Sequence, residues 1–395
     1  MKIAMIGQKG IPATWGGVET HVEALSTKLA NFGENIIVYT RPYYTSAEQV
    51  LSFNKQNQHI QLVSLPTIKS KHFDTIVHTF LATCHAMWHK ADIYHFHSVG
   101  PSLLSFLPKI FRPRARIITT FHCIDRQHAK WGFLARKILA LGEWTATKFS
   151  HKTITVSRTL QYYTKEVFGA KTAYIPNGVY PATYLKPSII TAEFGLQKDD
   201  YVLFVGRLVA HKGVHNLISA FKKIATDKKL VIVGDSVHTD AYVKSLKKLA
   251  ANDDRIIFTG FANGNKLKEL FANAYLFVQP SESEGLSIAL LEAASFGLPV
   301  LLSNIPANLE VVKENGFLFE SGNVLSLQKQ LQYLLGGPKD LSAFGKKLRL
   351  QVEKEYNWDV ISLQTLELYK TVYRQNTQKY SRLSATPVSM GLKNQ

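Results

Sequence analysis

The sequence predicts an α/β protein built from two doubly wound parallel sheets, one after the other along the chain. A buried strand, a glycine-rich loop and an amphipathic helix open the chain, which is how a doubly wound sheet begins. The same alternation of strand and helix starts again at Tyr201. The length of 395 residues exceeds one ordinary hydrophobic core and favours two domains.

The first domain is expected over residues 1–177. Its first strand is "KIAMIG", and apolar residues then recur at helical spacing until Gly33 ends the helix. These apolar residues are Val18, Val22, Leu25 and Leu29. Five more strands are expected in this domain, several of them separated by helical segments: "NIIVYT", "IQLVSL", "IYHFH", "RIITTFH" and "KTITVS".

A segment dense in Pro, Gly and Tyr, residues 177–190, is expected to link the two domains. The second domain is expected over residues 178–355, with strands at "YVLFVG", "LVIVGD", "IIFTG", "LFVQPS" and "PVLLS". A helix over residues 356–378 follows and is expected to pack back toward the first domain. The polar residues 379–395 are expected to be disordered.

The charge is strongly positive and unevenly distributed. The net charge is +18, and up to Tyr180 the chain carries 21 Lys and Arg against 9 Asp and Glu. The first domain is therefore expected to meet something anionic: a nucleic acid, a membrane surface or a phosphorylated substrate. Composition alone leaves these three open.

Several features favour a cytoplasmic location. No apolar run approaches the ~18 residues that span a bilayer. Met1 leads directly into a strand, which leaves no room for a signal peptide. The two cysteines, Cys84 and Cys123, lack metal-binding spacing and suit a reducing compartment as small buried hydrophobes.

Anion-binding groups gather where strands of the second domain end. Arg207 and Lys212 follow "YVLFVG", and a helix is expected to begin shortly after "LFVQPS". A helix N-terminus and two cations suit a phosphate group. The pair Gly16-Gly17 of the first domain lets backbone amides approach the same anion. The alternatives are solvated surface cations and a simple tight turn.

Two glutamates flank that helix start. Glu284 precedes the helix and Glu292 lies on it, so at ~1.5 Å per residue they are at most ~12 Å apart. This is too far for the ~5 Å carboxylate pair of a retaining hydrolase and long for the ~6.5–9.5 Å pair of an inverting one. It suits two hydroxyl-rich rings separated by a diphosphate. The alternatives are an acid that stabilises the helix dipole and an exposed helix position.

At these residues the sequence resembles the family 4 glycosyltransferases, which are retaining enzymes of the GT-B fold that use nucleotide sugars. The segment "PSESEGLSIALLEAASFGLPVLLS" resembles the family's E-x7-E block, and "VGRLVAHKG" its donor-phosphate motif. "IPNGV" and "GGVETHVEALSTKLANFG" resemble its interdomain segment and its N-terminal glycine loop and helix. The resemblance covers nearly the whole chain. "KGIPATWGGVET" further resembles a subgroup that includes bacterial rhamnosyltransferases of surface polysaccharide synthesis.

The resemblance assigns roles to particular residues. It implies that Glu284 faces the transferred sugar, that Glu292 binds the nucleotide ribose, and that Arg207 and Lys212 hold the diphosphate. His122 lies where the family has a histidine near the donor sugar and joins Glu284, Lys212 and Arg207 as a catalytic residue. Further donor contacts are expected from the loop Gly16-Gly17, from the base-side residue Phe261, and from Gly285, Leu286, Ser287 and Ile288. His97 lies at another strand end. A role in the site and a structural role, as a buried histidine whose hydrogen bonds are satisfied, are given equal weight.

No D-x-D motif occurs in the chain. The expected enzyme is therefore a metal-independent transferase with no cofactor beyond the nucleotide sugar as co-substrate. The expected mechanism is a front-face displacement: the acceptor hydroxyl attacks as the diphosphate leaves, and a departing phosphate oxygen helps to take its proton. Catalysis then consists mainly of orientation and charge stabilisation.

The acceptor is expected on the first domain, as a glycan or a polyprenyl-diphosphate-linked sugar. Residues 130–152 mix aromatic and basic side chains, which suits a helix on anionic lipid at the inner face of the cell membrane. A core helix with solvated lysines is the equal alternative. A sugar-nucleotide epimerase of the same fold and a basic nucleic-acid-binding protein are the rival functions. The second rival lacks a recognisable nucleic-acid-binding module in the sequence.

Overall fold

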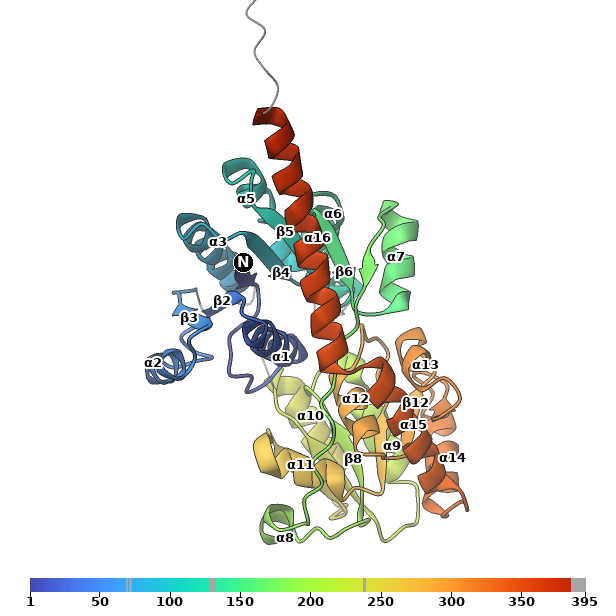
Figure 1. Ribbon diagram of the computed structural model, residues 1–395. Coiled ribbons are helices and arrows are strands. Elements are labelled where there is room, and N and C mark those ends of the chain that lie inside the picture. The colour runs from blue at the N-terminus through green and yellow to red at the C-terminus, as the bar shows by residue number, and fades with distance from the viewer. Residues whose placement is uncertain (69, 71–72, 128–131, 237–238, 385–395) are drawn as a thin grey trace, which may run out of the picture.

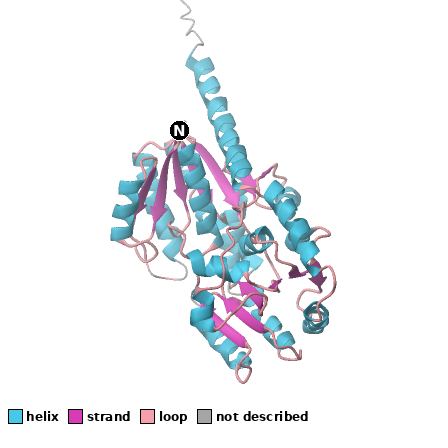
Figure 2. Ribbon diagram, turned by 60° about the horizontal axis from the view of Figure 1, so that its bottom comes forward, coloured by secondary structure: helices cyan, strands magenta, loops and turns pink. Residues whose placement is uncertain are grey.

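The computed structural model contains two α/β domains joined by a short linker (Figure 1). It describes residues 1–395 except 69, 71–72, 128–131, 237–238 and 385–395. Each domain is a parallel sheet with helices packed on both faces, as Figure 2 shows. The predicted fold class, two doubly wound parallel sheets in tandem, is confirmed.

The first sheet has seven strands in the order β3-β2-β1-β4-β5-β6-β7. The strands are β1 Lys2–Ile6, β2 Asn35–Thr40, β3 Ile60–Ser64, β4 Ile93–His97, β5 Arg116–Phe121, β6 Lys152–Thr155 and β7 Ala173–Tyr174. The helices are α1 Gly17–Asn31, α2 Ala47–Gln56, α3 Phe73–Trp88, α4 Val99–Ser102, α5 Phe106–Phe111, the 3-10 turn η1 Asp125–Gln127, α6 Phe133–Lys148 and α7 Arg158–Phe168. The strand order reverses between β1 and β4, and ligands of such sheets bind at the carboxyl ends there.

The second sheet has six strands in the order β10-β9-β8-β11-β12-β13. The strands are β8 Tyr201–Val205, β9 Lys229–Val233, β10 Ile256–Gly260, β11 Leu276–Gln279, β12 Val300–Ser303 and β13 Phe317–Phe319. The helices are α8 Ile189–Phe194, η2 Ala210–Lys212, α9 Val214–Phe221, α10 Asp240–Ala250, α11 Gly264–Ala272, α12 Ile288–Ser295, α13 Pro306–Val312, α14 Val324–Leu335, α15 Leu341–Glu355 and α16 Trp358–Ser384. Here the order reverses between β8 and β11.

Hydrophobic cores lie on both faces of each sheet. In β1, Ile3 and Met5 belong to one core cluster, whereas Ala4 and Ile6 belong to another. Successive strand residues point to opposite faces, so an apolar run such as this one buries both faces at once. This explains why the strands are continuous apolar runs in the sequence instead of alternating ones.

The last helix, α16, leaves the second domain and lies along the first, where it packs on α1 (Figure 1). Trp358, Ile361 and Tyr369 are buried in the core cluster that contains Ile3. The helix extends to Ser384, six residues beyond the expected end at residue 378. No Gly or Pro occurs between these positions to stop it. The rest of the expected disordered tail lies outside the described residues.

Helix α6 covers most of the expected basic and aromatic segment 130–152. Lys130 and Trp131 of that segment lie outside the described residues. One face of α6 is buried through Gly142, Glu143, Thr145 and Ala146. The first turn of α6 leaves Phe133 76% and Leu134 71% exposed. A search of the described helices finds none long and apolar enough to cross a membrane.

Candidate active site

The carboxyl ends of the two sheets face each other, and the start of α12 touches the first domain. The backbone of Gly285 approaches the carbonyl oxygen of His122 so closely that a Cβ on Gly285 would lie 1.7 Å from it. Asn177 Nδ2 donates a 2.9 Å hydrogen bond to the carbonyl oxygen of Leu286. Only a glycine fits at residue 285.

Lys212 and Glu284 form an ion pair at this boundary. Lys212 Nζ lies 2.5 Å from Glu284 Oε1, and the two side chains are 15% and 10% exposed. The turn that carries Lys212 ends at Gly213, which has a φ of 68° and no room for a side chain beside the carbonyl of Pro280. Two distant segments of the second domain are thereby locked together. An ion pair this poorly solvated holds both charges in fixed positions.

Arg207 lies two residues after the end of β8 and is exposed. Within the described part of the chain, its guanidinium has no ion-pair partner and no hydrogen bond. It nevertheless lies close enough to the first domain to help lower the pKa of Lys9 and to counter the raised pKa of Cys123. An uncompensated, fork-shaped cation at a strand end is suited to bind phosphate oxygens in two places.

Lys9 is a cation of the site that sequence reasoning missed. Its pKa is lowered to about 8, mainly by burial and with smaller contributions from Arg207 and Arg41, which together outweigh the opposing effect of Glu19. Its ammonium lies over the Trp15 ring, 3.6 Å from the centroid. Its position in the loop "GQKG", three residues after the first strand, was the available signal, because ligands bind at strand ends.

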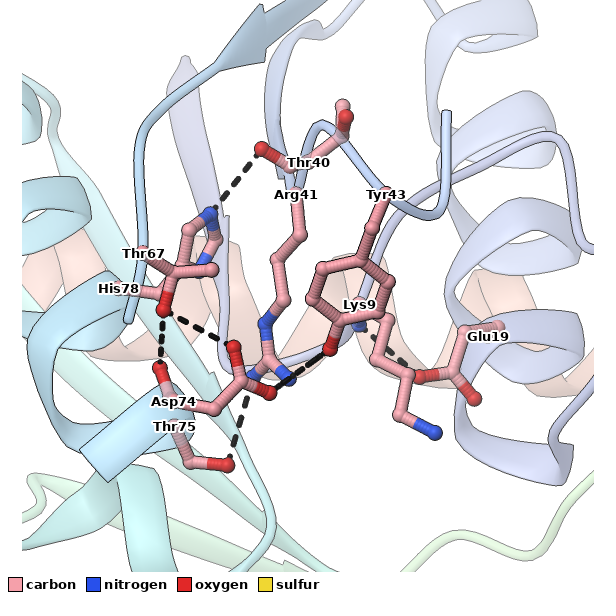
Figure 3. Close-up of polar contacts among 9 residues, drawn as sticks. All are labelled: Lys9, Glu19, Thr40, Arg41, Tyr43, Thr67, Asp74, Thr75 and His78. Atoms are coloured by element: carbon pink, nitrogen blue, oxygen red, sulfur yellow. Dashed lines mark hydrogen bonds and ion pairs between the residues drawn. The ribbon is translucent and has the colours of Figure 1, made fainter. Parts of the chain in front are cut away.

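The neighbouring side chains are firmly bonded to one another (Figure 3). Arg41 Nη1 lies 2.5 Å from Asp74 Oδ2, and Tyr43 donates a 2.7 Å hydrogen bond to the same oxygen. The backbone amide of Lys9 donates to Glu19 Oε1 at 2.9 Å. Unlike Arg41, whose guanidinium is held by Asp74, the Lys9 ammonium has no carboxylate in hydrogen-bonding contact among the residues described.

The glycine loop Gly16-Gly17 faces α12. Gly16 has a φ of 108°, and a Cβ there would collide with Glu19 Oε2 at 2.0 Å. For Gly17 the nearest atom to such a Cβ is Ile288 Cδ1, at 3.6 Å. Helix α1 starts at Gly17, so the N-termini of two helices, α1 and α12, point into one region. Both helix ends favour negative charge there.

The side chain of Ser287 sets the start of α12. Its hydroxyl caps the helix by accepting a 3.3 Å hydrogen bond from the amide of Leu290, and it donates to Gln279 Oε1 at 2.5 Å. Gln279 is the last residue of β11. The helix N-terminus is therefore anchored to the end of a central strand, which fixes where its free amides point.

Glu292 lies one turn further along α12 and is partly buried. Burial raises the pKa of its carboxyl to about 7. No group in the described chain donates a hydrogen bond to this carboxylate. A carboxylate that lacks a protein donor is free to accept hydrogen bonds from a ligand's hydroxyl groups.

The side chain of His122 is turned into the first domain. Its Nε2 lies 3.3 Å from His97 Nδ1, and both rings are buried. Burial lowers the pKa of both histidines well below the usual value. His122 thus faces the second domain with its carbonyl oxygen, at Gly285, and holds its ring against His97 instead.

Phe261 follows the edge strand β10 and is 42% exposed. It is separated from β8 by β9 in the sheet order, so its ring stands at the outer end of the row of strand ends. Such a position is accessible to a planar base. The structure thus brings together Arg207, Lys212, Glu284 and the start of α12, while Phe261 lies at their margin.

Comparison with known proteins points to one enzyme class. A model described as glycosyl transferases group 1 matches residues 189–351, and one described as glycosyltransferase family 4 matches residues 15–183. An uncharacterised glycosyltransferase of Methanocaldococcus jannaschii is 27% identical over 94% of this chain and 98% of its own. A glycogen synthase of Mycobacterium tuberculosis is 25% identical over 97% and 98%.

The fold agrees with solved structures. Anabaena HepE in complex with UDP and glucose superposes with a TM-score of 0.78 at 20% identity, covering 94% of this chain and 100% of that one. At this identity the likeness shows the fold alone. It confirms that the two domains are arranged as in the GT-B fold.

Proposed function

We propose that this chain, whose two halves match glycosyltransferase family models and whose fold is GT-B, is a retaining enzyme that transfers a sugar from a nucleoside diphosphate sugar to a glycan hydroxyl. The observation that carries the proposal is the Lys212–Glu284 ion pair at the domain boundary, together with Arg207, whose guanidinium has no partner among the described residues. Two cations and two helix N-termini supply the charge that a leaving diphosphate requires. Glu284 adds an acceptor for sugar hydroxyls next to them.

Each residue has a role in this scheme. Arg207 and Lys212 bind the diphosphate, with amides of Gly17 and of the α12 start completing its neutralisation. Glu284 binds the transferred sugar, and Glu292 binds the ribose. The carbonyl of His122, adjacent to Gly285, approaches the sugar from the acceptor side. A dipole aimed at the sugar stabilises positive charge that develops on it.

The reaction follows from these positions. The bond between the sugar's anomeric carbon and the diphosphate oxygen breaks, and the acceptor hydroxyl forms a new bond on the same face. The hydroxyl proton passes to the departing phosphate oxygen, so no protein nucleophile is required. The cations replace a divalent ion, and transfer needs no metal.

The proposed acceptor is a growing glycan or a polyprenyl-diphosphate-linked sugar of surface polysaccharide synthesis. The sequence resemblance of "KGIPATWGGVET" to a subgroup with rhamnosyltransferases supports a deoxyhexose donor. The net charge of the first domain and the exposed apolar face of α6 support docking on an anionic membrane. The epimerase alternative is not favoured, because the matching family models and the full-length relatives are glycosyltransferases.

The first test identifies the donor. Thermal shifts are measured with UDP-, GDP-, ADP- and dTDP-sugars, followed by transfer assays with and without chelator and determination of the product's anomeric configuration. We expect stabilisation by one nucleotide series, transfer that survives chelation, and retained configuration. An inverted product, or transfer that stops until a divalent ion is restored, contradicts the mechanism.

The second test addresses the site. Lys212→Ala and Glu284→Ala are expected to lower kcat/KM by about 100-fold or more, the range for lost transition-state charge stabilisation. Lys266→Ala is the matched control, because Lys266 forms a 2.5 Å ion pair with Glu193 at the surface of the same domain. Full activity in both site variants would refute the assignment.

A further inference from the structure

Three buried histidines lie together where the two domains meet. His21 comes from α1, His97 is the last residue of β4, and His122 follows β5. Each offers one ring nitrogen, and these atoms all lie within 4.8 Å of one another. Across the described chain, no other three His, Cys, Asp or Glu residues are grouped in this way. The group includes no carboxylate and no thiol.

The spacing of two of these nitrogens fits a shared metal ion. His97 Nδ1 and His122 Nε2 are 3.3 Å apart. Two nitrogens bonded to one tetrahedral zinc at ~2.0–2.1 Å are separated by ~3.3–3.4 Å. A metal ion bound between His97 and His122 would take the place of the proton in the hydrogen bond that now joins their rings. The third nitrogen needs to approach by no more than ~1.5 Å to complete the set.

The hydrogen bonds around His21 establish which of its nitrogens is free. Asn177 Nδ2 donates to the carbonyl of Leu286, so the amide oxygen of Asn177 must face His21. His21 Nδ1 lies 3.0 Å from this oxygen and therefore carries the ring proton. His21 Nε2 is left with its lone pair, buried and without a partner in the described chain. A carbonyl oxygen on the second nitrogen is the usual support of a metal-binding histidine.

In the neighbouring His95, both ring nitrogens have hydrogen-bond partners. Its Nδ1 lies 2.6 Å from the hydroxyl of Tyr369, and its Nε2 lies 2.7 Å from that of Thr120. Both nitrogens are engaged. In contrast, His97 Nε2 is a second buried nitrogen that lacks a partner among the residues described. In the cluster, the unpartnered His21 Nε2 is therefore the nitrogen available to join His97 Nδ1 and His122 Nε2 as a third ligand.

We propose that His21, His97 and His122 form a binding site for a transition-metal ion with zinc-like preferences. Imidazole donors select Zn²⁺, Co²⁺, Ni²⁺ or Cu²⁺ over Mg²⁺ and Ca²⁺. Three protein ligands leave the fourth position of a tetrahedral ion open. The ion has no part in the proposed transfer reaction, which needs no metal, and the proposal stands whether or not the proposed function is correct.

The test uses the full chain, stripped with a chelator and then loaded with Zn²⁺ or Co²⁺. We expect one bound ion per chain after gel filtration and a visible absorption band of four-coordinate Co²⁺. His21→Gln and His97→Gln should each weaken binding by about 100-fold or more, and Asn177→Ala by about tenfold, through loss of the outer support. Circular dichroism and thermal melting verify that each variant is folded.

The chain offers a matched control. His85 and His89 stack at 4.1 Å between ring centroids, and His89 is exposed, so this pair is the competing surface site. His89→Gln should leave the Co²⁺ band and the affinity unchanged. Loss of binding in His89→Gln, or binding that His21→Gln, His97→Gln and Asn177→Ala all leave intact, overturns the proposal. Absence of any stoichiometric ion in the unmodified chain overturns it as well.

Discussion

The carboxylate of Glu292 lowers the stability of the folded protein and, in the proposed function, binds the nucleotide ribose. Burial raises its pKa from 4.5 to about 7, so the folded chain keeps a proton that the unfolded chain releases. Stability therefore falls as the pH rises from about 4.5 to about 7 and stays low above that range. A buried carboxylate that lowers stability is useful only if its charged form has another role. The role proposed here is to accept hydrogen bonds from the ribose hydroxyls.

Glu292→Gln should therefore act in opposite directions on stability and on donor binding. At pH 8 we expect the variant to melt about 2–4 °C higher, since it avoids burying a charge, and to bind the nucleotide about tenfold more weakly. At pH 5 the two melting temperatures should converge, because both side chains are then neutral. Thermal melts and nucleotide titration at both pH values measure this.

A surface glutamate provides the comparison for this prediction. Glu367→Gln changes a side chain that is 66% exposed and paired with Lys370 across one helical turn. It should change neither the pH profile of melting nor the nucleotide affinity. If Glu292→Gln binds nucleotide as tightly as the unmodified chain at pH 8, its ribose-binding role is wrong.

At the residue scale, the sequence predicts acids and cations better than it predicts orientation. Arg207, Lys212 and Glu284 could be selected as candidates because charged residues stand out in the loops that follow strands. The ring of His122 could not be oriented, because its position depends on His97 in another strand. Lys9 was missed because the adjacent glycines and the helix they precede carry the stronger pattern.

At the scale of elements, α12 combines a helix cap with a proposed diphosphate site. The hydroxyl of Ser287 serves the helix and Gln279 at the same time, so its loss affects both the stability and the direction of the helix start. Ser46 offers an equivalent cap on α2, in a capping box with Gln49 at an exposed surface. Comparing variants of the two serines distinguishes the effect of a helix cap on stability from its effect on nucleotide binding.

Ser46→Ala should lower the free energy of unfolding by about 1 kcal/mol, the usual value of a serine cap. Ser287→Ala should lower it by about 2–4 kcal/mol, because the buried Gln279 Oε1 also loses its donor. Only Ser287→Ala should also weaken nucleotide binding, because only its helix start faces the proposed diphosphate. Urea unfolding and nucleotide titration give the two quantities. Equal nucleotide affinity in both variants would show that the start of α12 does not contact the donor.

Most elements could be predicted because their apolar periodicity is local. All eleven expected strands are present, whereas the two-residue β7 and the three-residue β13 were not expected. These edge strands are too short to show a pattern, and their pairing with β6 and β12 defines them. Short helices such as α4 and α5 likewise depend on packing against α3 and α6 more than on their own sequence.

At the scale of the whole molecule, contacts between the domains could not be predicted from sequence. Glu310 of α13 accepts hydrogen bonds from the backbone amide of Arg158, at 2.9 and 2.8 Å, and so supports the start of α7 in the other domain. Such a contact joins residues 152 positions apart and requires the relative placement of two finished domains. The contact of α16 with α1 likewise joins residues from opposite ends of the chain, and no pattern within either helix specifies the other as its partner.

The charge of the whole molecule leads to a prediction about membranes. The first domain carries most of the net positive charge, and α6 presents Phe133 and Leu134 beside Arg136 and Lys137 on its exposed face. Aromatic and aliphatic side chains flanked by cations insert at an anionic lipid surface, where each nearby cation contributes about 1 kcal/mol. Exposed side chains of similar size also occur on the second domain, at Leu325 and Leu350.

The full chain should float with anionic vesicles and not with neutral ones, and 1 M salt should release much of it because charge attraction is screened. The double variant Phe133→Ser, Leu134→Ser should bind about tenfold more weakly or worse, since two exposed apolar side chains no longer enter the lipid. The double variant Leu325→Ser, Leu350→Ser should bind like the unmodified chain. Equal flotation with neutral vesicles, or equal losses in both double variants, would mean that α6 is an ordinary helix with solvated lysines and that the acceptor reaches the first domain from solution.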